Sequence, residues 1–101
     1  MSDKNKVLQC DSVRFFSEFD EGQFFDWIKK IECISDCYGK GASIFLTIQF
    51  GSLDDDSLRE VLALFYRYKV DMKQLAGFET AANKSWFVNP NSYWYSQVFS
   101  S

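Results

Sequence analysis

The sequence predicts a small domain of the α+β class, in which an antiparallel sheet built on a central β-hairpin over residues 31–50 is covered by helices. Three observations lead to this prediction. Apolar residues alternate with polar ones in the second half of that hairpin, they recur at spacings of three and four over residues 53–68, and 19% of the 101 residues are aromatic. Because a buried aromatic ring removes roughly 150–250 Å² from water, a chain of this length can close a single core.

The domain organisation follows from composition along the chain. Residues 1–6 are polar and are expected to form a disordered N-terminus. Residues 7–101 contain no linker, internal repeat or low-complexity stretch. We therefore expect them to form a single α+β domain.

The first predicted elements precede the hairpin. Two mixed faces alternate over residues 13–19, one with Val13, Phe15, Ser17 and Phe19 and the other with Arg14, Phe16 and Glu18, which suggests a strand with both faces partly covered. A short helix is expected at about 21–30, capped by Asp20, with Gln23 three residues later as in a capping box. Phe19, just before that cap, is expected to pack against the helix as a hydrophobic staple.

The hairpin itself is predicted from its turn and its second strand. Residues 39–41 read Gly-Lys-Gly, and these glycines can adopt the positive φ of a tight turn. The expected inner face of the second strand consists of Ile44, Leu46, Ile48 and Phe50. The hairpin should therefore turn one apolar face towards the helices.

The longest helix is predicted at about 53–68. Its apolar stripe should face the sheet and consists of Leu58, Val61, Leu62, Phe65 and Tyr68. On its outer side Asp55 and Arg59 are four residues apart and are expected to form an ion pair.

Two short helices are predicted near the C-terminus. Asp71 is expected to cap a helix at about 72–77, with Gln74 at the third position of a second capping box. Asn89 followed by Pro90 marks the start of a terminal helix at about 90–99, because proline is tolerated in the first turn.

The chain has little catalytic equipment. It contains no histidine, the residue that most readily moves protons near neutral pH and that most often binds metals. The three cysteines, Cys10, Cys33 and Cys37, fit neither a disulfide framework nor a metal site, and are expected to be reduced and mostly buried. A nucleophilic role for Cys33 or Cys37 would need a base other than histidine. We expect no enzymatic activity, no cofactor and no bound metal.

Charge and hydropathy indicate a class of partner and a compartment. The formal net charge of −3 argues against nucleic acid as a partner, because phosphate binding normally requires clustered lysine and arginine. The sequence has neither a secretory signal pattern nor an apolar run long enough to span a bilayer. We expect a cytoplasmic protein that does not bind membranes.

The candidate partner-binding residues centre on a run of aspartates. A contiguous cluster of like charges is more easily tolerated where a cationic partner relieves the repulsion, although helix starts also collect aspartates for structural reasons. The predicted set comprises Asp54, Asp55, Asp56 and Glu60, with Asp36 near the hairpin turn and Tyr66 as an anchor.

The order of features from the aspartate run onward resembles a known group of proteins. The segments that carry the resemblance are LREVLALFYRY at 58–68, VDMKQL at 70–75, NKSWF at 83–87, YWY at 93–95 and VF at 98–99, together with WIKKIEC at 27–33. They resemble small bacterial immunity proteins, particularly those paired with polymorphic toxins of contact-dependent growth inhibition systems. The resemblance implies an inhibitor that binds one cognate toxin domain, often a nuclease, in the cytoplasm.

Two functions from different classes follow from these observations. The first is a non-enzymatic immunity protein that neutralises a toxin by occluding its active site or substrate cleft. The alternative is a small-molecule-binding or regulatory domain, whose many aromatic side chains would line a ligand pocket. The sequence leaves the oligomeric state open.

Overall fold

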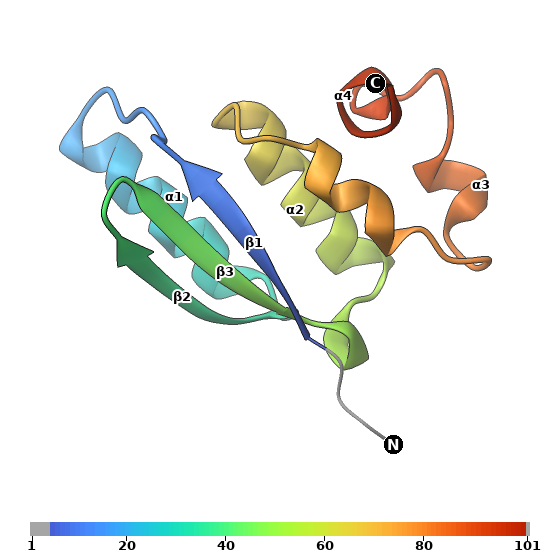
Figure 1. Ribbon diagram of the computed structural model, residues 1–101, viewed down its shortest axis with the longest axis horizontal. Helices are drawn as coiled ribbons and strands as arrows, with labels where there is room; N and C mark the ends of the chain where they lie inside the picture. The colour runs from blue at the N-terminus through green and yellow to red at the C-terminus, as the bar shows by residue number, and fades with distance from the viewer. Residues whose placement is uncertain (1–4, 101) are drawn as a thin grey trace.

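A three-stranded antiparallel sheet with helices packed on one of its faces forms the framework of the protein (Figure 1). The computed structural model describes residues 5–100. The strands are β1 (Asn5–Asp11), β2 (Ile34–Lys40) and β3 (Ser43–Gln49), in the order β1-β3-β2. The predicted α+β class is confirmed.

The first strand is where the sequence prediction differs most from the structure. β1 pairs with β3, with Leu8 opposite Leu46, and its side chains alternate between core and solvent. Of the predicted disordered segment, residues 1–4 lie outside the described residues, whereas Asn5 and Lys6 belong to β1. β1 was missed because only two of its seven residues, Leu8 and Cys10, are buried and they are flanked by polar residues.

The strand predicted at residues 13–19 is wrong, because helix α1 (Glu18–Lys30) begins inside it. Its true N-cap is Ser17, whose hydroxyl accepts a hydrogen bond from the Asp20 backbone N–H at 3.1 Å. The Asp20 carboxylate reaches back and accepts from the Phe16 N–H at 2.9 Å. Asp20 therefore holds the third helical position rather than the cap. The predicted staple is also wrong, because the Phe19 side chain is 90% exposed.

The predicted hairpin is confirmed as β2 and β3, but its turn lies later than predicted, because Gly39 and Lys40 belong to β2 and pair with Ile44 and Ser43 of β3. The turn between them places Gly41 at φ +62°, a conformation that glycine adopts without strain. An irregularity between Ile34 and Asp36 leaves Ser35 without a partner on β3. Phe50, expected on the inner face of the second strand, instead begins the short 3₁₀-helix η1 (Phe50–Ser52).

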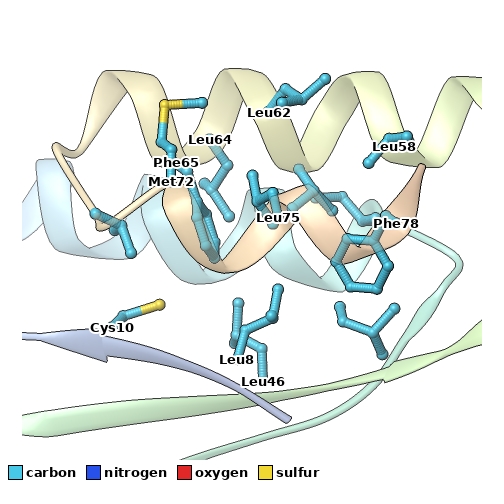
Figure 2. Packing of buried hydrophobic residues seen from close by; sticks show 14 of the residues in the cluster. Leu8, Cys10, Leu46, Leu58, Leu62, Leu64, Phe65, Met72, Leu75 and Phe78 are labelled. Atoms are coloured by element: carbon cyan, nitrogen blue, oxygen red, sulfur yellow. The ribbon is translucent and has the colours of Figure 1, made fainter. Parts of the chain in front are cut away.

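Helix α2 (Asp55–Arg67) supplies most of the helical side of the core. Its predicted apolar stripe is confirmed, since all five of its residues are buried. Figure 2 shows how Leu58, Leu62, Leu64 and Phe65 of this helix lie above Leu8, Cys10 and Leu46 of the sheet, with Leu75 and Phe78 between the two layers. The sheet and α2 thus share one continuous core.

The 3₁₀-helix η2 (Lys73–Phe78) covers the outer edge of β1. The predicted cap at Asp71 is wrong, because the N-cap of this helix is Met72 and no described side chain caps it. The Asp71 carboxylate accepts a hydrogen bond from the Lys73 N–H at 3.0 Å in the turn before the helix, and Gln74 donates to the Asp71 carbonyl at 2.8 Å instead of completing a capping box. The Gln74 side-chain amide then acts as a substitute for a neighbouring strand. Its oxygen accepts from the Gln9 N–H at 3.0 Å and its nitrogen donates to the Gln9 carbonyl at 2.9 Å.

The C-terminal region contains two short helices, α3 (Lys84–Phe87) and α4 (Tyr95–Phe99). The single helix predicted at 90–99 is therefore wrong in its first half. There the Asn89 side chain accepts from the Asn91 N–H at 2.9 Å and forms a local turn. α4 packs against η2. Within the described part of the chain, no helix is long and apolar enough to cross a membrane.

Gln74 provides a test of the β1 edge. We expect Gln74→Ala to lower the free energy of unfolding by about 1 kcal/mol, because two exposed hydrogen bonds to the Gln9 backbone are lost. Gln23→Ala, on an exposed position of α1, is the matched control and should change stability by less than half of that. Urea denaturation followed by circular dichroism measures both. Equal effects would mean that the Gln74 amide does not stabilise the edge.

Candidate functional site

The aspartate run at the start of α2 is partly occupied in holding the helix. The Asp54 carboxylate is the N-cap and accepts a hydrogen bond from the Ser57 backbone N–H at 2.8 Å. That bond and a further one from the Ser57 side chain lower the pKa of Asp54. Asp54 therefore has the structural role that aspartates commonly have at helix starts.

The next two aspartates differ from each other. Asp56 forms an ion pair with Arg59, with 3.9 Å between the oxygen and the guanidinium nitrogen, so the predicted pair between Asp55 and Arg59 is wrong. Both aspartates line a hollow at the start of α2 together with Asn83. The Asn83 side chain is already hydrogen-bonded to the backbone of Phe78 and Thr80, so this hollow offers carboxylates and no free amide.

Glu60, one turn further along α2, is held by an aromatic side chain of α1. Its carboxylate accepts a hydrogen bond from the Trp27 indole nitrogen of α1 at 2.9 Å. The pKa of Tyr93, in the loop before α4, is raised first by burial and then by the negative charge of Glu60. The hydrogen bond from Trp27 links Glu60 on α2 to α1.

Tyr66 continues this surface towards the end of α2. Its ring meets the Tyr93 ring edge-on, with 4.8 Å between the ring centres. The two side chains are 48% and 47% exposed. We call the set Trp27, Glu60, Tyr66 and Tyr93 the acidic-aromatic surface. It is extended by Arg59, whose guanidinium lies 4.2 Å from the centre of the Trp86 ring.

Asp36 lies on another side of the molecule. It is opposite Thr47 in the β2–β3 pairing, whereas the flanking β3 residues Leu46 and Ile48 are buried against the helices. Side chains alternate between the two faces of a sheet, so Asp36 is on the face that the helices leave uncovered. The structure thus brings Glu60 and Tyr66 onto one surface and separates Asp36 from them.

Trp27 and Tyr93 are the functional candidates that the sequence analysis missed. Trp27 adjoins Ile28, a core residue, and nothing in the local sequence signals a hydrogen bond to a residue 33 positions later. Tyr93 belongs to an aromatic-rich segment in which burial differs from one ring to the next. Their exposure depends on tertiary packing rather than on local pattern.

The three thiols are poorly suited to nucleophilic chemistry. Burial raises the pKa of Cys10 to about 12 and that of Cys33 to about 11. Burial and the charge of Asp36 also raise the pKa of Cys37. A cysteine nucleophile needs the opposite shift, because the thiolate is the reactive form. Among residues 5–100, no three potential metal ligands come close enough together to hold an ion.

The largest buried aromatic side chains fill the core rather than line a ligand pocket. Phe24, Phe65, Phe78 and Phe87 are all fully buried. The most apolar hollow has a volume of about 200 Å³ and is bordered by Phe25 and Tyr38. Sites for drug-sized ligands are usually about 300–1,000 Å³ and mostly apolar. The larger hollows, such as the one beside Trp27 and Glu60, contain several charged side chains.

Comparison with known proteins gives no match: no family model, no curated protein and no solved structure is significantly similar to this chain.

The raised thiol pKa values predict an order of reactivity. At pH 8 we expect a thiol-specific reagent such as Ellman's reagent to modify Cys37 first, because it is the least buried of the three cysteines. Cys10 and Cys33 should react only after unfolding in denaturant, which both exposes them and returns their pKa to the usual range. Mass spectrometry of the labelled peptides identifies the sites. Rapid labelling of Cys33 in the folded protein would contradict this order.

Proposed function

We propose that this protein is an immunity protein, which binds a cognate bacterial toxin domain in the cytoplasm and neutralises it by occluding its active site or substrate cleft. The observation that carries the proposal is the acidic-aromatic surface, where the Trp27 indole donates a hydrogen bond to the Glu60 carboxylate and the half-exposed rings of Tyr66 and Tyr93 meet edge-on. The resemblance of the C-terminal segments to immunity proteins of contact-dependent growth inhibition systems supports the same function.

Electrostatics favours a basic partner for this surface. The chain has a net charge of −3, and the hollow between α1 and α2 is bordered by two carboxylates, Asp26 and Glu60, against one ammonium group, Lys30. A nuclease toxin has a basic cleft for its phosphate-rich substrate. Opposite potentials of this kind can raise association rates to about 10⁸ M⁻¹s⁻¹ or more at low salt.

The aromatic members of the surface provide the apolar contact that a tight complex requires. Tyrosine, tryptophan and arginine are the residues that most often dominate binding energy, provided that the complex removes them from water. Tyr66 and Tyr93 are each about half exposed and already support one another edge-on. A partner that covers both rings would therefore bind a largely preformed anchor with little side-chain ordering.

The alternative function, a small-molecule-binding domain, has less support in the structure. Its aromatic pocket would have to be the hollow beside Phe25 and Tyr38, which at about 200 Å³ is smaller than most ligand sites. We therefore favour protein binding.

A co-expression experiment tests the proposal directly. The product of the gene immediately upstream should be toxic when expressed alone, harmless when this protein is co-expressed, and recovered with it in a pull-down. Absence of both binding and protection would refute the proposal.

Variants of the proposed surface should distinguish residues that speed the approach of the toxin from residues that hold it in the complex. Replacing Asp54, Asp55 and Asp56 together with asparagine should slow toxin association about tenfold at low salt and weaken its salt dependence, because steering charge is lost. Asparagine still caps helices, so the fold should be kept. Glu60→Gln should slow association less than the triple variant, and Tyr66→Ala should mainly accelerate dissociation.

The matched control is Glu18→Gln, which removes one charge from the first turn of α1, outside the acidic-aromatic surface. Surface plasmon resonance at several salt concentrations measures both rate constants. If the triple variant associates as fast as the wild type, the aspartate run serves only to start α2.

A further inference from the structure

The two edges of the sheet differ in how they are covered. At the edge formed by β1, the Gln74 side chain occupies the backbone N–H and carbonyl of Gln9. At the other edge, no described element pairs with the outer side of β2, which is the outermost strand in Figure 1. Because backbone groups alternate in direction along a strand, half of those in β2 face outward without a strand partner.

The regular part of β2 is short and has defined ends. On one side the irregularity at Ser35 interrupts the pairing, and on the other the turn at Gly41 ends the strand. The regular run is therefore 36–40, and its midpoint is Tyr38. When two identical strands pair antiparallel about a two-fold axis, the longest match aligns the midpoint of the run with itself.

We propose that the β2 edge pairs with the β2 edge of a second copy of this chain, in antiparallel register centred on Tyr38. The two sheets would then join into one continuous sheet of six strands. This inference is independent of toxin binding, because β2 contributes nothing to the acidic-aromatic surface.

The charges along β2 are complementary to themselves in this register. Asp36 and Lys40 each lie two residues from Tyr38, so Asp36 of one copy is opposite Lys40 of the other, twice per dimer. All three side chains are exposed on the uncovered face of the sheet. Edge strands often carry charges that discourage pairing. Like charges at these two positions would repel a second copy, whereas the opposite charges found here attract it.

The other face of β2 leaves room for the second copy. Cys37 is opposite Gly39 of the second copy in this register, and glycine has no side chain to collide with the thiol. Beside Gly39 is the apolar hollow of about 200 Å³ between α1 and β2. The Tyr38 ring stacks on Phe45, with 5.2 Å between ring centres and 21° between planes, so it lies over its own sheet and leaves the backbone edge free.

The length of the edge determines the strength of the dimer. Five paired residues and the adjoining surface of α1 form an interface at the small end of the known range, below ~1,200 Å² in total. We therefore expect a reversible monomer–dimer equilibrium with a dissociation constant between ~10 µM and ~1 mM.

Charge exchange tests the register. Asp36→Lys places two lysines opposite each other, and Lys40→Asp places two aspartates opposite each other, so sedimentation velocity from ~10 µM to ~1 mM should show each variant as a monomer. An equimolar mixture of the two variants should form a heterodimer, because both pairs are then of opposite charge. The double variant Asp36→Lys/Lys40→Asp should dimerise like the wild type. Circular dichroism of each variant confirms that it is folded.

A covalent variant tests the same register independently of charge. In a Cys37→Ser background, Tyr38→Cys should give a disulfide-linked dimer on mild oxidation, because the two introduced thiols meet on the axis. The matched control is Val7→Cys in the same background, an exposed position on β1 that should give several-fold less cross-linking.

Two results would overturn the proposal. One is a wild-type chain that stays monomeric to ~1 mM, which would leave this edge to a strand from another protein. The other is a mixture of the charge-reversed variants that fails to associate.

Discussion

The structure depends on the fact that β1 and β3 send all their fully buried side chains to the same side of the sheet. Leu8, Leu46 and Ile48 are fully buried, and α2 packs its apolar stripe against that side. Helices cover only one face of the sheet, so its other face is exposed to solvent. Within the described residues, the sheet also has two edge strands, β1 and β2, whose outward backbone groups have no neighbouring strand. The remaining elements are arranged around this constraint. η2 closes one edge, while the outer side of α2 carries the acidic-aromatic surface.

The elements with a long regular pattern were predictable from the sequence. The hairpin and α2 have period-two and helical repeats that agree with their burial, so local preference and tertiary packing favour the same structure. The start of α1 was placed three residues late because Ser17 and Asp20 are both good capping residues. The Ser17 hydroxyl accepts from the Asp20 N–H, and the Asp20 carboxylate accepts from the Phe16 N–H. Only the structure shows that Ser17 is the cap and Asp20 lies inside the helix.

The segments that were mispredicted depend on distant contacts. β1 is too short to show a clear period, and it exists because β3 and Gln74 supply its hydrogen bonds. Phe15 belongs to a loop and still reaches the core, where its ring meets those of Phe24 and Tyr68. A partly buried apolar residue in a loop therefore gave the segment the pattern of a strand. Near the C-terminus, the Trp94 indole donates a hydrogen bond to the Phe87 carbonyl of α3 at 2.7 Å. This contact with a distant residue occurs just before α4, in the part of the segment 90–99 that was wrongly predicted to be helical.

The candidate site was predictable in chemical character and only partly in position. Acidic residues near the start of α2 were correctly placed on its exposed side, yet Asp54 is occupied as a cap and Asp56 is paired with Arg59. The neighbours of Glu60 come from α1 and from the loop before α4, and no local spacing could identify them. Residue type therefore predicted an exposed acidic surface, whereas chain folding determined which acid has an aromatic side chain as its hydrogen-bond partner.

The arrangement also separates two kinds of negative charge. Glu60 is held by the Trp27 indole in a fixed position beside half-exposed rings, so a partner meets a preformed group. Asp36 has no such environment, and Lys40, four residues later on the same strand, carries the opposite charge. The first arrangement suits recognition of a different, basic molecule, and the second suits recognition of an identical strand. Because they lie on opposite sides of the sheet, occupation of one surface leaves the other accessible.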